Sequence, residues 1–209
     1  MAPSARARTH DGYGVRVTRP SSGGRAQARP PALLVIDMQQ IFSDPASQWA
    51  TAGYAEAADR VAQLVDAATG PVIWTRFVRD PSEPGSWRAY YDRWSECREA
   101  PESVAWDLTM TVRDGDAVLT LPTFSKWGEQ LAEFTAAHPE LIVCGVATDC
   151  CVLSTVLGAV DAGKAITVVT DACAGATEEA HDQALALMGM LAPMVRLATV
   201  DEVLQLPAS

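Results

Sequence analysis

The sequence predicts a three-layer α/β/α protein, in which a Rossmann-like parallel sheet carries helices on both faces. From Pro31 onward, short apolar runs rich in β-branched residues alternate with longer segments whose apolar residues recur at helical spacing. The length of 209 residues and the hydrophobic content of 48% suit one domain with a well-filled core. We therefore expect a single α/β domain over residues 31–209.

The first half of the chain predicts two strands and the helix between them. A buried strand is expected over Ala32–Asp37, and a helix over Tyr54–Ala68 that Gly70 and Pro71 bring to an end. The next strand is expected over Pro71–Phe77. An irregular, aromatic-rich stretch then extends to about residue 111.

The second half of the chain repeats the alternation with shorter connections. Parallel strands need crossover connections, and the predicted helices supply them. In chain order we expect a strand over Ala117–Leu121, a helix over Trp127–His138, a strand over Leu141–Val146, a helix over Asp149–Ala162, a strand over Ile166–Asp171, a helix over Glu178–Leu191 and a strand over Met194–Thr199.

Charge and composition narrow the class of partner. The formal net charge of −10 disfavours nucleic acid and anionic membranes, because phosphate binding needs a basic patch. No window approaches the roughly twenty apolar residues of a membrane span, and the N-terminus lacks the apolar core of a secretory signal. The five cysteines fit neither a disulfide framework nor a metal knuckle. We expect a cytoplasmic protein that binds a small molecule, with no nucleic acid and no membrane.

Residues 1–30 differ in composition from the rest of the chain. They hold six arginines against a single acid, Asp11, with many small residues and prolines and no hydrophobic period. We therefore predict a disordered N-terminal extension. A targeting piece or a nucleic-acid arm is the alternative to a dispensable extension.

Three chemistry-bearing residues follow predicted strands, at the edge where parallel sheets bind ligands. Asp37 ends the first strand, Lys126 comes shortly after the third, and Cys151 follows the fourth. A carboxylate beside a thiol can accept the thiol proton and later donate it to a leaving amine, as amide cleavage requires. Lys126 would stabilise both negative groups. The alternatives are that Asp37 caps the next turn and that Lys126 is a solvated surface lysine.

Cys151 is the candidate nucleophile. A thiol in the first turn of a helix meets unpaired backbone N–H groups and the positive end of the helix dipole, which lower its pKa below about 8.5. We therefore expect a thiolate. For Cys144 and Cys173 we favour a buried apolar role instead, and a vicinal disulfide between Cys150 and Cys151 is a further alternative.

The segments VIDMQ around Asp37 and GVATDCCV around Cys151, on this strand pattern, resemble the isochorismatase-like cysteine hydrolase family, which includes nicotinamidases and N-carbamoylsarcosine amidohydrolases. The resemblance covers about Pro31 to Leu204 and implies the isochorismatase-like hydrolase fold. It also implies that Asp37 is the acid and Cys151, rather than Cys150, the nucleophile. The implied reaction is cleavage of a C–N bond in a small amide or carbamoyl-type substrate through an acyl-enzyme.

The same resemblance implies a cis peptide bond between Val146 and Ala147, and an oxyanion hole formed by the backbone N–H groups of Ala147 and Cys151. It also implies a lysine in the catalytic triad, but the family pattern puts Leu121 at that position. We assign Lys126 to the triad, because its long side chain can reach the same point from a nearby backbone position.

No metal site is expected. Nicotinamidases bind a divalent metal through an Asp and several His near the second strand, and the corresponding segment here, WTRFVRDPSEPG, has no histidine. The three histidines are His10, His138 and His181, and none makes ligand spacing with another. We therefore predict no metal and no cofactor, disfavour nicotinamide as substrate, and expect His181 to be a structural helix residue.

The segment SWRAYYDRW places Trp87 and Tyr91 at helical spacing. We predict that they border the substrate site as a lid, which would favour an aromatic or apolar substrate group. The alternative is a core stripe or a subunit contact. A homodimer or homotetramer is what the family resemblance implies.

Three rival functions are weighed against the amide-type hydrolase. A vinyl-ether hydrolase acting on an isochorismate-type compound does not depend on the cysteine in this family, so the presence of Cys151 counts against it. A catalytically silent binding protein on the same scaffold is favoured by the displaced lysine. A dinucleotide-binding oxidoreductase is disfavoured, because no G-x-G-x-x-G follows the first strand.

Overall fold

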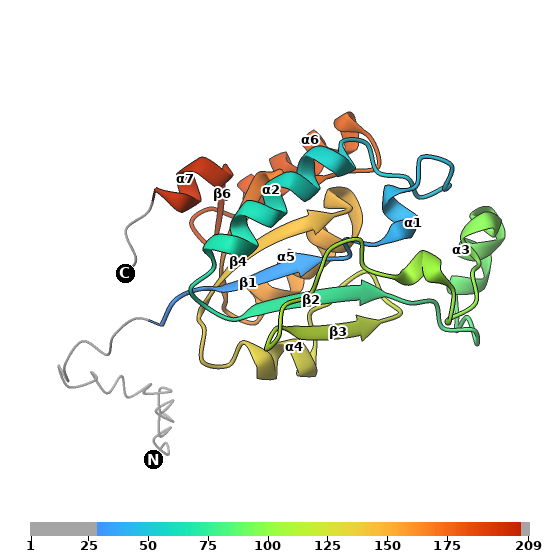
Figure 1. Cartoon of the computed structure of the whole chain (residues 1–209), viewed down its shortest axis with the longest axis horizontal. Helices are drawn as coiled ribbons and strands as arrows, with labels where there is room; N and C mark the ends of the chain where they lie inside the picture. The colour runs from blue at the N-terminus through green and yellow to red at the C-terminus, as the bar shows by residue number, and fades with distance from the viewer. Residues whose placement is uncertain (1–28, 206–209) are drawn as a thin grey trace, which may run out of the picture.

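A computed structural model describes residues 29–205. They form a six-stranded sheet in the order β3-β2-β1-β4-β5-β6, and every pairing is parallel (Figure 1). The predicted fold class is therefore confirmed. The strands are β1 (Ala32–Ile36), β2 (Val72–Phe77), β3 (Ala117–Leu121), β4 (Glu140–Val146), β5 (Ala165–Ala174) and β6 (Val195–Ala198).

Helices cover both faces of the sheet. In Figure 1, α2 lies in front of the strands, where it packs against α7, and α5 lies behind them, where it packs against α6. The α-helices are α1 (Gln40–Ser43), α2 (Tyr54–Ala67), α3 (Trp87–Arg93), α4 (Glu129–Phe134), α5 (Leu153–Asp161), α6 (Glu178–Gly189) and α7 (Val200–Leu204). Two 3₁₀ turns, η1 (Ser95–Cys97) and η2 (Val104–Trp106), and a π-helical segment, η3 (Thr148–Val152), complete the described elements.

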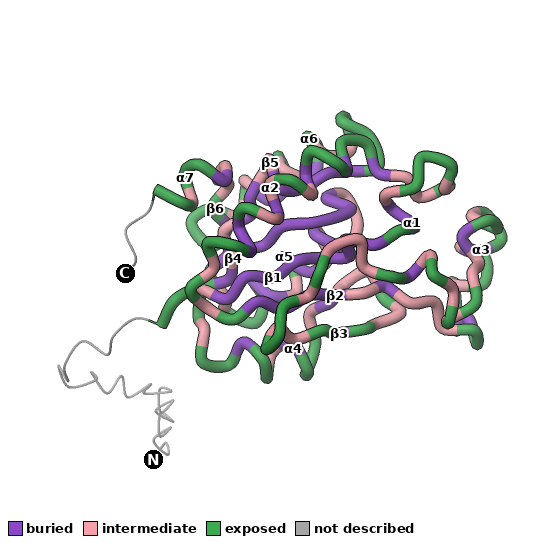
Figure 2. The backbone as a smooth tube through the Cα atoms, viewed as in Figure 1, coloured by how far each residue is buried: buried purple, intermediate pink, exposed green. Residues whose placement is uncertain are grey.

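The burial of each element follows its place in the sheet. All five residues of the central strand β1 are buried, whereas the edge strand β3 has one buried residue (Figure 2). This explains the uninterrupted apolar run of β1, which has helices over both of its faces. In α2 the buried residues recur at helical spacing and face the sheet; they are Tyr54, Ala57, Val61, Leu64 and Val65.

The structure differs from the prediction mainly at element ends. The helix expected over Trp127–His138 is confined to Glu129–Phe134, and the helix expected from Asp149 begins as the π-helical segment η3. Strand β5 continues three residues beyond its predicted end, past a register shift in its pairing with β4. Helix α7 was not predicted, although Thr199 and Glu202 form a capping box at its start.

The predicted disordered extension lies outside the described residues, except for Arg29 and Pro30. The carbonyl of Pro30 lies 2.8 Å from Nδ1 of His138. No helix among the described residues is long and apolar enough to cross a membrane.

Gly145 allows β4 to pass close to β1 just before the chain turns into the site. Its φ is +111°, and a Cβ built on it would overlap the backbone carbonyl of Ile36. We expect Gly145→Ala to lower the free energy of unfolding by about 3 kcal/mol or more, because steric overlap adds to backbone strain.

A urea titration measures this loss, and Gly163→Ala provides the matched control. Gly163 has a φ of +86°, but a Cβ added to it would have no atom of a described, non-adjacent residue within 4 Å, so its substitution carries strain without overlap. It should cost only about 1 kcal/mol. Equal losses in the two variants would contradict the close approach of β4 to β1.

Candidate active site

The strand order places the candidate site at the point where the chain changes direction across the sheet. From β1 the chain continues to β2 on one side, and from β4 it continues to β5 on the other. The crevice beyond the carboxyl ends of such neighbouring strands is the usual ligand site of this architecture. Asp37 directly follows β1, and Ala147 directly follows β4.

Asp37 is fully buried and adopts a left-handed backbone conformation, with φ +49°. Its position is fixed by Thr75 of β2, whose hydroxyl donates a 2.6 Å hydrogen bond to Oδ1. The Asp37 backbone N–H also donates to the Thr75 hydroxyl oxygen, at 3.2 Å. The other carboxylate oxygen, Oδ2, accepts no hydrogen bond from any described residue. This oxygen contacts the ammonium of Lys126.

Lys126 supplies the charge that allows a carboxylate at this depth. Its Nζ lies 2.9 Å from Asp37 Oδ2, and both side chains are 0% exposed. The ammonium also donates a hydrogen bond to the Thr123 carbonyl, at 2.8 Å. The same Nζ lies 4.9 Å from the ring centre of Phe77, a cation–π distance. The structure thus places Lys126 beside Asp37, from a position five residues beyond Leu121.

Thr155 joins the loop of Lys126 to the helix that follows Cys151. Its hydroxyl accepts a 2.9 Å hydrogen bond from the Lys126 backbone N–H and donates a 2.6 Å bond to the Cys151 carbonyl. Both bonds are buried, where they are less weakened by water. The positions of the lysine and the cysteine are therefore coupled through one side chain.

Cys151 lies in the π-helical segment η3 and is 3% exposed. Two contacts hold the start of this segment: Thr148 Oγ1 lies 2.8 Å from Nδ1 of His181, and Asp149 Oδ1 accepts a 2.9 Å bond from the Ala176 N–H. His181 lies in α6 and through this contact connects that helix to the start of η3. Single π-helical turns are rare and are found often at functional sites.

The expectation of a thiolate is wrong for this environment. A hydrogen bond with the Cys150 side chain, burial and the charge of Asp37 raise the pKa of Cys151 well above its ordinary value, against the opposing charge of Lys126. The Cys150 hydrogen bond and burial together outweigh the effect of the helix start, which the sequence alone indicated. The raised pKa favours a neutral thiol, so attack by this candidate nucleophile would require a base. Cys150 and Cys151 are both free, with no vicinal disulfide.

The backbone beside Cys151 offers two candidate oxyanion donors. The Val146–Ala147 peptide bond is cis, as the family resemblance implies. The Ala147 carbonyl accepts hydrogen bonds from the N–H groups of Cys150 and Val152, but not from Cys151 between them. Within residues 29–205, the Ala147 N–H itself donates to no backbone carbonyl outside the regular ladders. These two N–H groups can therefore serve an incoming oxygen.

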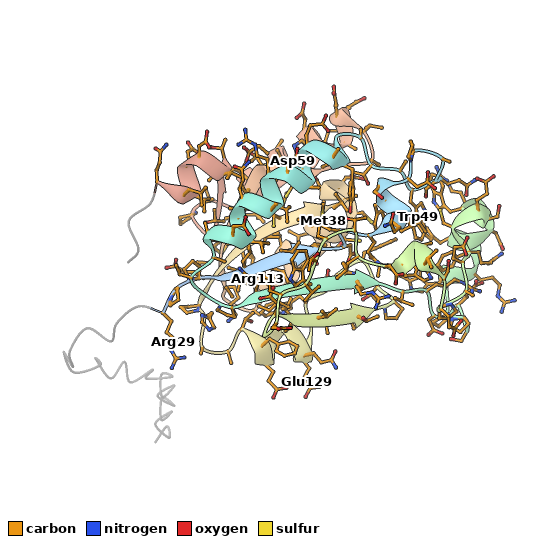
Figure 3. All side chains as sticks on the ribbon, in the orientation of Figure 1. Arg29, Met38, Trp49, Asp59, Arg113 and Glu129 are labelled. Atoms are coloured by element: carbon orange, nitrogen blue, oxygen red, sulfur yellow. The ribbon has the colours of Figure 1, made fainter. Side chains whose placement is uncertain are left out.

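A cavity of about 160 Å³ opens over Cys151. Cys150, Cys151, Ala147 and Asp149 line it on one side, and six aromatic side chains line it elsewhere. The aromatic residues are Phe42, Trp49, Phe77, Tyr90, Trp94 and Phe124. Figure 3 labels Trp49 beyond the ends of the strand arrows, near α1 and the segment that carries α3.

Trp87 and Tyr91, the predicted binding residues, do not line this cavity. Tyr91 is 1% exposed, and both residues border a separate, smaller cavity beside Pro84. The ring of Trp87 lies 4.8 Å from that of Phe124, so it supports the wall from behind. Helical periodicity located α3 but did not show which of its faces meets the site. The lining residues from α3 and its end are Tyr90 and Trp94.

Metal ligands do not gather in the described part of the chain. No group of three or more His, Cys, Asp or Glu side chains there could hold a metal ion. Near Asp37, the basic group is an ammonium rather than an imidazole. The residues present therefore do not fit the metal site that nicotinamidases carry.

The site residues predicted from the sequence did not include Gln39 or Thr75. Gln39 is fully buried, and its amide donates to the carbonyls of Phe77 and Trp106 and accepts from the Phe77 N–H. It thereby ties the chain after β1 to the end of β2. A lone Thr inside the apolar run of β2 was the available signal for Thr75, and the VIDMQ motif was the signal for Gln39.

Comparison with known proteins agrees with this geometry. The family model of the Isochorismatase domain matches residues 31–200. The nicotinamidase of Escherichia coli (strain K12) is 46% identical over 63 residues, which is 30% of this chain and 30% of that protein. The match therefore spans less than a third of the length of that relative.

Solved structures share the fold over most of the chain. An isochorismatase family protein from Desulfovibrio vulgaris superposes with a TM-score of 0.73 at 21% identity, covering 84% of this chain and 98% of the other. A cysteine hydrolase from Pseudomonas syringae pv. phaseolicola gives a TM-score of 0.71 at 21% identity, covering 84% and 91%. With the Isochorismatase domain model matched over most of its length, this chain belongs to the isochorismatase family.

Proposed function

We propose that the protein cleaves a C–N bond of a small amide or carbamoyl-type compound through an acyl-enzyme on Cys151. The observation that carries this proposal is the buried Asp37–Lys126 pair next to a buried thiol at the base of a cavity. Asp37 has an oxygen with no hydrogen bond, and Cys151 has a proton to transfer. These are a base and a nucleophile in the protonation states that the first step requires.

In the proposed reaction, Asp37 takes the Cys151 proton as sulfur attacks the substrate carbonyl carbon. The carbonyl oxygen becomes an oxyanion that the N–H groups of Ala147 and Cys151 stabilise, each by roughly 3 kcal/mol. Asp37 then donates its proton to the leaving nitrogen, the C–N bond breaks, and a thioester remains on Cys151. Water, deprotonated by Asp37, hydrolyses the thioester and restores the thiol and carboxylate.

Lys126 contributes electrostatically to each of these steps. Its ammonium lies 2.9 Å from Asp37 Oδ2, and its charge lowers the pKa of Cys151, so it stabilises the negative charge that passes to sulfur. In this reaction the proton passes between Cys151, Asp37 and the leaving nitrogen, and Lys126 takes no part in its transfer. The proposal therefore assigns it a catalytic role without a proton transfer.

Trapping the thioester tests the proposal. The protein is incubated with a series of small amides and carbamoyl compounds, and the reaction is quenched in acid. The protein is then digested, and the masses of its peptides are measured by mass spectrometry. We expect the peptide with Cys151 to gain the acyl mass, with amine released in the same experiment. Amine release without any acylation of Cys151 would contradict the mechanism. Neither release nor acylation with any compound would favour a silent binding scaffold.

A further inference from the structure

Part of the cavity wall comes from a segment that lies outside the sheet and its covering helices. Tyr90, in α3, and Trp94, at its end, line the cavity over Cys151. Figure 1 shows α3 beyond the carboxyl end of β2, away from α2, α5 and α6. The position of these two rings therefore depends on contacts that the segment 79–99 makes outside the sheet.

A buried ion cluster joins the two ends of this segment. Glu83, which precedes α3, is 8% exposed. Its Oε1 accepts hydrogen bonds from Arg79 Nε at 2.8 Å and Nη2 at 2.6 Å, and from Arg98 Nε at 2.8 Å. Its Oε2 accepts a 2.9 Å bond from Arg98 Nη2, so Arg98 contacts both carboxylate oxygens. We call Glu83, Arg79 and Arg98 the clamp.

Glu83 has a strained backbone. Among the described residues other than glycine, only Glu83, with φ +44°, and Asp37, the candidate base, have a positive φ. Such strain persists only where the surroundings enforce it, and it is found at active sites and ligand clamps. The hydrogen bond from Arg98, as the largest effect, lowers the pKa of Glu83, so the carboxylate is ionised at neutral pH. Its charge-assisted hydrogen bonds offset the strain.

The clamp contacts the back of the cavity wall. The guanidinium of Arg79 lies 5.5 Å from the ring centre of Tyr91, and that of Arg98 lies 6.0 Å from the same ring. Tyr91 is 1% exposed and directly follows Tyr90, with the two ring centres 5.9 Å apart. The clamp therefore fixes Tyr91 and, through it, the ring that lines the cavity.

The clamp is separate from the reacting groups. None of its three residues lines the cavity over Cys151, and none is among the groups that shift the pKa of Cys151. Loss of the clamp can therefore change access to the thiol without removing the base or the nucleophile.

We propose that Glu83 is a positioning residue that, through the clamp, holds the α3 part of the cavity wall in place and sets the size of the compound that reaches Cys151. This inference rests on the proposed function only in taking Cys151 as the reacting atom. Without the carboxylate, two guanidinium groups are left unpaired and repel each other, so the segment 79–99 moves away from the cavity. Bulky compounds then reach the thiol, and small ones are held less tightly.

Alkylation of Cys151 by two uncharged reagents of different size tests the inference without turnover. Iodoacetamide is small, whereas the four fused rings of N-(1-pyrenyl)maleimide are too large for a cavity of about 160 Å³, which is well below the roughly 300 Å³ of pockets for drug-sized ligands. Each rate is divided by that of the same reagent with free cysteine, and peptide fragmentation assigns the adduct to Cys151 rather than Cys150. We expect Glu83→Gln to raise the rate with the pyrenyl reagent, relative to that with iodoacetamide, about tenfold.

Glu96→Gln is the matched control. Glu96 is an exposed acid of the same segment and forms no ion pair with any described residue, so its substitution should leave the ratio of the two rates unchanged. Arg98→Lys keeps the charge but loses the contact with both carboxylate oxygens, and it should raise the ratio about threefold. Circular dichroism verifies that each variant is folded.

Kinetics give a second readout that a general loss of stability would not produce. For any compound that the wild type hydrolyses, Glu83→Gln should raise KM about tenfold and keep kcat within about twofold, because the reacting groups stay in place. Glu96→Gln should change neither constant.

Each result decides the inference. The same ratio of rates in Glu83→Gln and Glu96→Gln would overturn it, and so would a fall in kcat with KM unchanged. If Glu83→Gln does not fold, an unchanged ratio in Arg98→Lys overturns it and a raised ratio supports it. A raised ratio combined with no hydrolysis of any compound by the wild type would leave the inference standing and remove the proposed function.

Discussion

Replacing Cys151 with Ala is expected to lower kcat by at least about 10⁴-fold, because the attacking atom is removed and water must attack the amide directly. The protein should remain folded. The side chain is 3% exposed and small, so its truncation should reduce the free energy of unfolding by only about 1 kcal/mol. Amine release measures the first effect, and a urea titration the second.

Cys144→Ala is the matched control for this result. Cys144 is also fully buried, seven residues earlier in β4, and its thiol meets only a backbone carbonyl, that of Leu34 at 3.7 Å. The same atoms are removed from the same depth, so a comparable loss of stability is expected with kcat unchanged. Turnover near the wild-type level in Cys151→Ala would contradict the nucleophile assignment, and it would favour chemistry that bypasses the cysteine.

The fold was predictable because its signal is local and repeated. Every predicted strand exists, and the signal is plainest in β1, because a strand covered by helices on both faces has a continuous apolar run. The element ends were less predictable, because they depend on tertiary contacts. Helix α4 is confined to Glu129–Phe134, and the π-helical turn before α5 leaves no mark in the apolar pattern.

The candidate site was predictable as a set of residues but not as an electrostatic environment. Strand ends and family motifs brought Asp37, Lys126 and Cys151 into one hypothesis, and the structure places Lys126 Nζ against Asp37. The expected lowering of the Cys151 pKa was wrong, because a hydrogen bond with the neighbouring Cys150 side chain and burial in the folded chain both raise this pKa. The prediction of which α3 residues line the cavity was also wrong, because the orientation of α3 depends on its packing in the folded chain. The neighbouring residues Tyr90 and Tyr91 face different cavities.

Substitutions in the Asp37–Lys126 pair should separate stability from catalysis. Asp37→Asn and Lys126→Met each leave one buried charge unpaired, and each is expected to lower the free energy of unfolding by about 3 kcal/mol or more. The double variant removes both charges, so its stability should return close to that of the wild type. All three variants should lose about 10²- to 10⁴-fold in kcat, because the base or its counterion is missing.

Lys164→Met is the control for the lysine change. Lys164 donates to the carbonyls of Thr135 and His138 rather than to a carboxylate, so its replacement leaves no unpaired acid. The kcat of the Lys164→Met variant should be unchanged. Adding Asp37→Asn to this variant should not restore its stability. If the double variant were as unstable as the sum of the two single variants, the ion pair would not exist in solution.

The rate at which iodoacetamide alkylates Cys151 at neutral pH is a second test of the Asp37–Lys126 pair. This rate should change in opposite directions in the two single variants. The raised pKa of Cys151 means that labelling of the wild type is slow and accelerates as the pH rises. The charge of Asp37 raises this pKa and the charge of Lys126 lowers it. Asp37→Asn should therefore label faster than the wild type and Lys126→Met more slowly, although both lose turnover. Changes of the same sign in the two variants would mean that general loosening, rather than charge, controls access to the thiol, and the assignment of Asp37 as its base would lose its electrostatic support.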